Sequence, residues 1–272
     1  MDLRPLLTLA ITLSAACTII GEPGSGVAAT ETLDLPAFDA VRLTNQIDLE
    51  IMEGDAVAGE VTCDDNLLDN LRFEVREGTL VIDTPLGQEI RPRTDCFAVI
   101  TAVGLRGLAL TGSGDIAAAD FAELSSIASS ASGNMVVAST GASGVDVDQS
   151  GSGDVELLDA SGAATVTTDT SGSGDLTIGA IDAGSVEVDL RGSGNTTLDG
   201  MTDELVIQSR ASGDVDAAAL EAVDVEVDLS GSGNASVSAS GEVTGRISGS
   251  GDVIVNGDAS ISVTTTGSGR VR

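Results

Sequence analysis

Acidic side chains that recur at a fixed interval are the residues of this chain best placed to do chemistry. Nine times an Asp, an Asn or, once, an Arg follows a Gly-Ser-Gly turn or a close variant of it. These residues are Asp115, Asn134, Asp154, Asp175, Asn195, Asp214, Asn234, Asp252 and Arg270. Similar turns are typical of calcium-binding β-rolls, although those rolls have a repeat about half as long. Because Asx side chains can also bond backbone amides, we predict a structural role and no metal site or cofactor, with calcium binding as the alternative.

A second set of carboxylates is predicted to stack on the outward side of the strand before each turn. The set comprises Asp148, Asp169, Asp189 and Asp228, with Gln208 among them and with Asp146, Glu187 and Glu226 beside them. Stacked strands lie about 4.8 Å apart, so carboxylates in register repel each other. We expect salt to screen this repulsion over a Debye length of about 8 Å. Bridging by loosely bound cations is the alternative.

The residue inventory excludes several kinds of site. The chain has no His, which removes Ser-His-Asp catalysis, Cys-His catalysis and imidazole metal sites. Its twelve cationic residues are all Arg, and a net charge of −31 repels nucleic acid. We therefore predict no catalytic residues, no enzymatic activity and no nucleic-acid partner. A β-helix that cleaves polysaccharides with paired carboxylates is the alternative.

The first residues of the chain are predicted to be a targeting signal and an anchor. Arg4 precedes an apolar run that is too short to span a membrane, and small residues lead to Cys17. We interpret residues 1–16 as a signal peptide and residues 17–34 as a lipidated Cys17 with a flexible tether. Cys17 resembles the cysteine of a bacterial lipobox, but Ser14 replaces the usual Leu, Val or Ile. An ordinary signal peptide is therefore the alternative.

Cys63 and Cys96 are the two remaining cysteines. In an exported chain, an even pair of cysteines favours a disulfide. Two buried thiols are the alternative, since the sequence does not supply the geometry of the pair.

The spacing of the turns identifies the architecture that positions these residues. Successive turns are 18 to 21 residues apart over more than half of the chain, which indicates stacked repeats. Apolar residues alternate on both sides of each turn, as at Val145 and Val147 before it and at Val155 and Leu157 after it. We predict an all-β fold: a single-chain parallel β-helix (β-solenoid) of about 20 residues per coil, regular over residues 111–272. Right-handed coiling is expected, because parallel crossover connections are usually right-handed.

The second Gly of each turn keeps its column in all nine coils, as at Gly133 and Gly153. Glycine is needed where the backbone has a positive φ or where a neighbouring backbone comes very close. Either cause would explain the column.

Residues 35–110 repeat less regularly. Strands are predicted at Ala40 to Leu43, Ile47 to Met52, Gly59 to Thr62, Leu71 to Val75, Thr79 to Ile82 and Phe97 to Thr101. We interpret the segment as an irregular N-terminal part of the β-solenoid that covers its exposed end. A separate small β domain is the alternative.

Several short motifs in this region resemble those of one known family. They are Phe38-Asp39-Ala40-Val41, Ile47-Asp48-Leu49-Glu50-Ile51, Asp64-Asp65-Asn66-Leu67-Leu68 and Gly78-Thr79-Leu80-Val81-Ile82. Together with the Gly-Ser-Gly-Asp turns, they resemble the putative auto-transporter adhesin head (GIN) domain family over about residues 35–270. The resemblance implies an exported bacterial β-helix of the cell envelope, and it transfers no catalytic residue.

These observations predict a non-enzymatic lipoprotein of the cell envelope, in the outer membrane or the periplasm. Its nine coils would present an acidic surface about 40 Å long for adhesion, interaction or structural support. We expect an unidentified envelope or extracellular partner, and membrane contact through the lipid anchor only. A calcium-binding assembly module is the alternative function.

Overall fold

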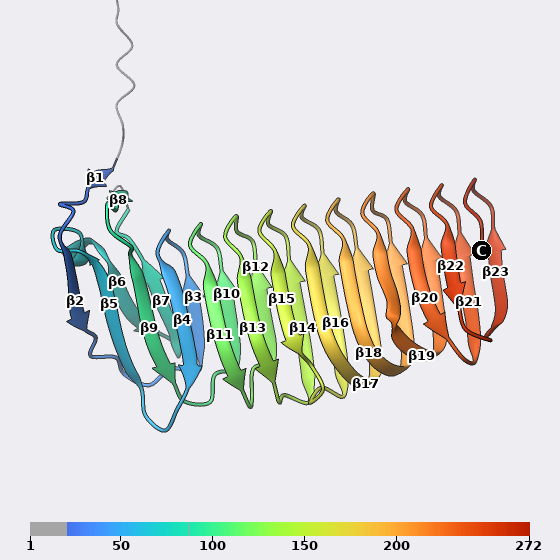
Figure 1. The fold of residues 1–272 in the computed structure, drawn as a ribbon, viewed down its shortest axis with the longest axis horizontal. Coiled ribbons are helices and arrows are strands. Elements are labelled where there is room, and N and C mark those ends of the chain that lie inside the picture. The colour runs from blue at the N-terminus through green and yellow to red at the C-terminus, as the bar shows by residue number, and fades with distance from the viewer. Residues whose placement is uncertain (1–20, 87) are drawn as a thin grey trace, which may run out of the picture.

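A computed structural model describes residues 21–86 and 88–272 of the chain (Figure 1). It confirms the predicted fold class: the described residues are almost all in strands or turns, and they stack as a parallel β-solenoid of about 20 residues per coil. The handedness of the coil stays a prediction. Each coil contributes one strand to each of two opposed sheets, called here sheet A and sheet B, so that the molecule is a long rod with two broad faces.

The strands of sheet A, in spatial order, are β2 (Ala28–Thr32), β5 (Ala58–Asp64), β9 (Phe97–Ala102), β4 (Asp48–Glu53), β11 (Ile116–Phe121), β13 (Met135–Thr140), β15 (Val155–Asp159), the first parts of β17 (Leu176–Leu190), β18 (Thr196–Ser209) and β19 (Val215–Leu229), then β20 (Ala235–Ala239) and β22 (Val253–Asn256). Those of sheet B are β6 (Arg72–Arg76), β7 (Thr79–Asp83), β3 (Ala40–Leu43), β10 (Gly107–Leu110), β12 (Ser126–Ser129), β14 (Gly144–Gln149), β16 (Thr165–Thr170), the second parts of β17, β18 and β19, then β21 (Glu242–Ile247) and β23 (Ser260–Thr265). A short parallel pair, β1 (Glu22–Pro23) with β8 (Ile90–Arg91), and the 3-10 helix η1 (Leu68–Asn70) complete the described elements.

The two long edges of the rod are built differently. The Gly-Ser-Gly-Asp turns connect sheet B to sheet A and form the turn edge, at the top of Figure 1. The opposite connections, from sheet A to sheet B, form the corner edge. In β17, β18 and β19 this connection is itself extended, so one strand runs from sheet A through the corner into sheet B.

The core lies between the sheets and is filled by the apolar residues that alternate along each strand. The registers place like residues above one another, as with Val155 beside Leu176 and Val166 beside Val186. All four are buried, and full burial of one aliphatic side chain contributes about 1.5–3 kcal/mol. Ile261 is in register with the buried Val243 but is 51% exposed, because no further coil covers β23 among the described residues.

The N-terminal coils are not stacked in chain order. The coil made by β3 and β4 lies between β7 and β9 on one side and β10 and β11 on the other. The chain therefore makes one coil, builds the end of the rod outward from it, and then crosses to its other side to begin the regular repeats. Three antiparallel pairings, β2 with β5, β5 with β9 and β6 with β7, close this end.

The prediction of a flexible tether over residues 17–34 is wrong for its second half. Strand β2 pairs with β5 from Ala28 to Thr32, and the amide of Ser25 donates to Asn66 Oδ1 at 2.7 Å. A composition rich in Gly, Ala, Ser and Pro suggested a linker, but Ala and Thr also fit an exposed edge strand when a neighbouring strand offers free backbone groups.

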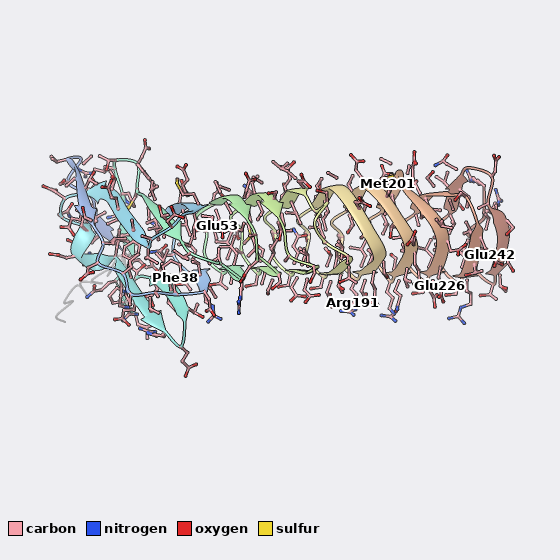
Figure 2. All side chains as sticks on the ribbon, turned by 90° about the horizontal axis from the view of Figure 1, so that it is seen from below. Phe38, Glu53, Arg191, Met201, Glu226 and Glu242 are labelled. Carbon is pink, nitrogen blue, oxygen red and sulfur yellow. A yellow bond between two sulfur atoms is a disulfide. The ribbon has the colours of Figure 1, made fainter. Side chains whose placement is uncertain are left out.

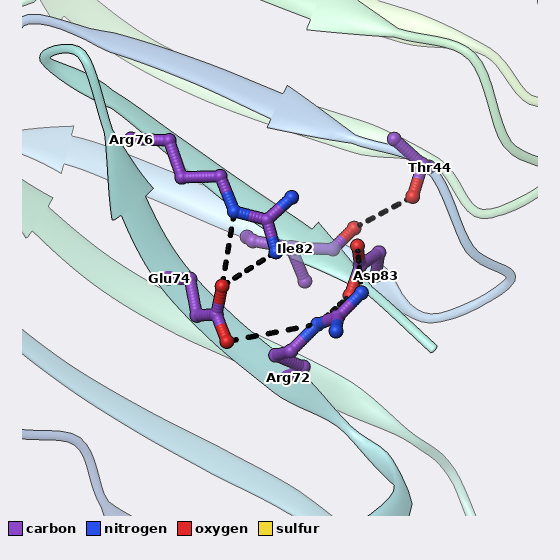
Figure 3. Close-up of polar contacts among 6 residues, drawn as sticks. All are labelled: Thr44, Arg72, Glu74, Arg76, Ile82 and Asp83. Carbon is purple, nitrogen blue, oxygen red and sulfur yellow. Dashed lines mark hydrogen bonds and ion pairs between the residues drawn. The ribbon is translucent and has the colours of Figure 1, made fainter. Parts of the chain in front are cut away.

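Charged side chains cover β6, the outermost strand of sheet B. Arg72 forms two hydrogen bonds with Asp83 of β7, at 2.6 and 2.7 Å, and Glu74 contacts both Arg72 and Arg76 (Figure 3). These contacts raise the pKa of Arg72 above its ordinary value, with the Asp83 bond as the main cause. Charges on an outer strand oppose pairing with another chain, so this end of the rod is protected from edge-to-edge association.

Candidate interaction surface

The Asp and Asn of the turns form one ladder of hydrogen bonds along the turn edge. In each coil the side-chain Oδ1 accepts from the backbone N–H of the equivalent residue in the next coil, at 2.6–3.0 Å. These Asp and Asn side chains have a structural role, as expected. Each one, however, accepts from a backbone amide of the next coil and not from an amide of its own turn. The ladder also begins one coil earlier than the motif, at Asp48, whose Oδ1 accepts from Asp115.

Asn residues separate the charges of this ladder. The Nδ2 of Asn195 donates to Asp175 Oδ1 at 3.1 Å, and that of Asn234 donates to Asp214 Oδ1 at 3.2 Å. A neutral amide between two carboxylates removes their direct repulsion and adds a donor. The ladder therefore gives a physical reason for Asn at positions where a calcium roll would have Asp. Within residues 21–86 and 88–272, no three carboxylate or thiol groups converge in a way that could hold a metal ion.

The invariant Gly of the turn is explained by close approach and not by a positive φ. A Cβ on Gly153 would lie 1.9 Å from the carbonyl oxygen of Gly133 in the preceding coil, and the other coils show the same contact. None of the nine residues in this column is in the left-handed region. The backbones of successive turns therefore touch directly, which brings the ladder atoms within bonding distance.

The second predicted set of carboxylates is aligned on the outer face of sheet B. Asp148 pairs in register with Asp169, which pairs with Asp189, and the column continues through Gln208 to Asp228. Two residues earlier along each strand, Asp146, Glu187 and Glu226 share a parallel column with Thr167 and Val206. We call these two columns the acidic face.

Arginines of later coils pair with part of this face. Arg191 bonds Asp169 at 2.9 Å and also contacts Asp189, so one guanidinium joins carboxylates of two coils. Its bond to Asp169 is the main reason that the pKa of Arg191 is raised above its ordinary value. Arg246 lies 3.4 Å from Asp228. Sequence reasoning weighed salt screening against bound cations and missed these arginines, although the position of Arg191 two residues after Asp189 was a usable signal.

Sheet A carries a different surface near the N-terminal end. Phe97 and Val136 are each 37% exposed, and with Ala117 and Glu50 they line a hollow of about 460 Å³. The two broad faces of the rod thus differ: sheet B is acidic over its central coils, and sheet A is partly apolar over its first coils.

The two cysteines and a buried carboxylate hold the N-terminal end together. Cys63 and Cys96 are joined by a disulfide, with their Cα atoms 4.2 Å apart. The neighbouring Asp64 is fully buried and accepts from the backbone amides of Arg93, Thr94 and Gly26, at 2.8, 3.1 and 2.5 Å. Burial raises the pKa of Asp64, but these amide bonds outweigh it and hold that pKa below its ordinary value.

The signal peptide and Cys17 lie outside the described residues. Among the residues that the structure does describe, no helix is long and apolar enough to cross a membrane.

Known proteins match this chain both in sequence pattern and in fold. A family model described as "Putative auto-transporter adhesin, head GIN domain" matches residues 37–173 and 158–259. The two matched ranges together cover the N-terminal coils and nearly all of the regular repeats. No curated protein matches the chain.

Several solved structures have the same fold over nearly their whole length. A putative adhesin from Parabacteroides distasonis is 19% identical, with a TM-score of 0.65 over 92% of this chain and 99% of that one. A putative adhesin from Parabacteroides merdae is 18% identical, with a TM-score of 0.65 over 93% and 98%. A third structure, named as a putative lipid binding protein from P. distasonis, is 25% identical, with a TM-score of 0.64 over 92% and 98%.

Proposed function

Because the chain belongs to the putative auto-transporter adhesin, head GIN domain family, we propose that it is a non-enzymatic protein of the cell envelope that binds another surface molecule. Two Parabacteroides structures of the same fold are each named as a putative adhesin. The sequence supports a role without catalysis, since it has no His to act as a general base.

The acidic face is the observation that carries this proposal. Its carboxylates come from four of five consecutive coils, with Gln208 and Val206 of β18 between them, and are held in register by the pairing of β14, β16 and the second parts of β17, β18 and β19. A rigid array that repeats about every 4.8 Å is suited to an extended ligand that makes the same contact several times. Each contact is weak when exposed, but contacts on one rigid body act together.

We further propose that Cys17 is acylated and anchors the protein to the envelope, in the outer membrane or the periplasm. Strand β1 begins at Glu22, five positions after Cys17, and lies at the closed end of the rod (Figure 1). An anchor there would hold the closed end near the membrane and leave the acidic face accessible. The anchor is tested by feeding a bacterial host an alkyne-tagged palmitate: the full-length chain should take up label, and a Cys17→Ser variant should not.

The binding role is tested with beads that carry the purified full-length chain, in flow over immobilised bacterial envelope fractions. We expect retention of these beads, and a clear loss of retention when the acidic face is neutralised by Asp148→Asn, Glu187→Gln and Glu226→Gln together. All three side chains are outward, so the variant should fold normally, which circular dichroism checks.

A variant with three neutralised carboxylates away from this face, Glu31→Gln, Glu60→Gln and Asp69→Asn, is the matched control for charge. Retention that falls equally in both variants would assign the effect to net charge alone. Beads that are never retained would contradict the proposed function.

A further inference from the structure

A groove of about 740 Å³ runs along the corner edge over the later coils. Its floor is a column of small residues in register, one from each coil: Ala183, Thr202, Ala222 and Ala239. All four are buried, and the hydroxyl of Thr202 is occupied by a 3.0 Å bond to the carbonyl of Glu204. The floor therefore offers shape and little polarity, so any selectivity comes from the walls.

The residues on either side of the floor form two walls that point outward. One wall is Asp182, Met201, Glu221 and Ser238, and the other is Gly184, Asp203, Val223 and Ser240. Asp258 lies at the C-terminal end of the groove. The walls thus alternate acidic and apolar side chains, with each of three consecutive coils contributing one carboxylate.

The depth of the groove comes from a shortening of the coils. Between β19 and β20 the register passes from Ala217 beside Val237 directly to Glu221 beside Ser238, so three residues of β19 have no counterpart. The corner of β19 therefore projects further than that of the next coil. On the walls, Met201 and Val223 are exposed, with 54% and 44% of their surface accessible.

The carboxylates of the groove differ from those of the acidic face in their neighbours. Arg191 and Arg246 pair with aspartates of the acidic face, whereas no arginine of the described residues forms an ion pair with a groove carboxylate. Figure 2 shows Arg191 on the opposite side of the rod from Met201. The groove thus combines uncompensated negative charge with exposed aliphatic surface.

We propose that this groove binds an extended cationic segment of a partner protein, in which Lys or Arg alternates with aliphatic residues. The inference rests on the proposed binding function and names the kind of partner. Cationic side chains would pair with Asp182, Asp203 and Glu221, and aliphatic side chains would pack against Met201 and Val223. The apolar walls favour a peptide over a bare metal ion, since a metal gains nothing from them. The groove spans six coils, about 24 Å, which accommodates roughly seven residues of an extended chain.

The probe for this proposal is a fluorescein-labelled ten-residue peptide in which Lys alternates with Val or Ser. Its binding to the full-length chain in detergent is measured by fluorescence anisotropy, with a Glu, Val and Ser peptide as the control ligand. We expect the Lys peptide to bind and the Glu peptide not to bind. The double variant Asp203→Asn with Glu221→Gln should weaken binding by about tenfold, since two exposed ion pairs are lost.

The matched control is Glu31→Gln with Glu60→Gln, which removes two exposed charges in β2 and β5, away from both the groove and the acidic face. It should change the affinity by less than about twofold. A Met201→Ser with Val223→Ser variant should weaken binding without any change of charge. Equal loss in the groove and control variants would overturn the proposal in favour of general charge attraction, and so would failure of the unmodified chain to bind the peptide.

A second measurement does not depend on variants. A peptide with a photoreactive group should cross-link at the corners of β17, β18 and β19, and cross-links confined to other surfaces would overturn the proposal. Failure here is distinguishable from failure of the proposed function. If the unmodified chain does not bind the peptide while its beads are still retained on envelope fractions, the groove proposal fails and the proposed binding function stands.

Discussion

Asp154 Oδ1 accepts one bond, at 2.8 Å, from the amide of Asp175, whose own carboxylate brings a second negative charge into the next step of the ladder. Elsewhere in the regular repeats an Asn separates such charges. Hydrogen bonding and repulsion therefore act against each other at this step, and side-chain replacement can separate them.

Replacing Asp154 by Ala removes the acceptor and should lower the free energy of unfolding by about 1 kcal/mol. Asp154→Asn keeps an acceptor oxygen and removes one charge, so it should be at least as stable as the unmodified chain. Urea denaturation followed by circular dichroism measures both. If Asp154→Asn lowers the free energy of unfolding as much as Asp154→Ala does, the charge itself is needed at this position. A bound cation then becomes the better interpretation.

Asp64 should make the N-terminal end sensitive to acid. Its pKa is lower in the folded chain than in the unfolded chain, because three backbone amides donate to its carboxylate. The stability that it contributes is therefore complete above the unfolded pKa and is lost as the pH falls through the folded pKa. Asp64→Asn should lower the melting temperature at pH 7, since one oxygen becomes an NH₂ group that cannot accept.

The difference in melting temperature between the unmodified chain and Asp64→Asn should shrink as the pH falls below 4. The neighbouring Asp65→Asn is the control, because Asp65 is exposed and its carboxylate accepts a bond from the Ser25 hydroxyl and none from a backbone amide within the described part of the chain. A difference that stays constant down to pH 2.5 would show that the charge of Asp64 does not stabilise the fold.

At the scale of the elements, the turn is the part that tolerates least change. A Cβ on Gly153 would meet a backbone oxygen at 1.9 Å, whereas a Cβ on Gly184 would lie 3.5 Å from the nearest backbone atom, in ordinary contact. Gly153→Ala should therefore cost about 2–3 kcal/mol, because stacked backbones must move apart. Gly184→Ala should cost less than about 0.5 kcal/mol, and similar costs for the two would contradict the close-approach explanation of the column.

Strand positions were predictable from sequence more fully than the path between them. Ala40–Leu43 is the strand β3 that was expected, and the expected strands near β4, β5, β6, β7 and β9 are all present within two residues of their bounds. Their alternation specifies which side faces the core. It does not specify that the β3 and β4 coil is enclosed between later coils, since that depends on pairing between strands far apart in the chain.

The candidate site was predictable to a similar extent. Period and alternation placed Asp148, Asp169 and Asp189 in one column, because the side-chain repeat of a strand is two and the coil length is nearly constant. The groove was not foreseen. It depends on a corner at which three residues of β19 have no counterpart in the next coil. The spacing of the turns shortens there by only two residues, from 20 to 18, and does not show where in the coil the change lies.

For the whole molecule, the arrangement of charge matters more than its amount. Carboxylates are aligned on sheet B, and apolar side chains gather on the first part of sheet A. The groove of the corner edge has carboxylates and apolar side chains of its own. The turn edge carries charges that are already bonded to backbone amides. The surfaces that can engage a partner are therefore the acidic face and the groove.

The net charge of −31 should make the stability of the rod depend on ionic strength and not on the identity of the cation. Repulsion between carboxylates in register weakens as the Debye length falls from about 30 Å at 0.01 M salt to about 8 Å at 0.15 M. We expect the melting temperature to rise by about 5 °C over this range of sodium chloride. Calcium chloride at the same ionic strength should give the same rise, and a chelator should not reverse it, because the ladder oxygens already accept from amides. A larger rise with calcium that the chelator reverses would instead support a calcium-dependent assembly.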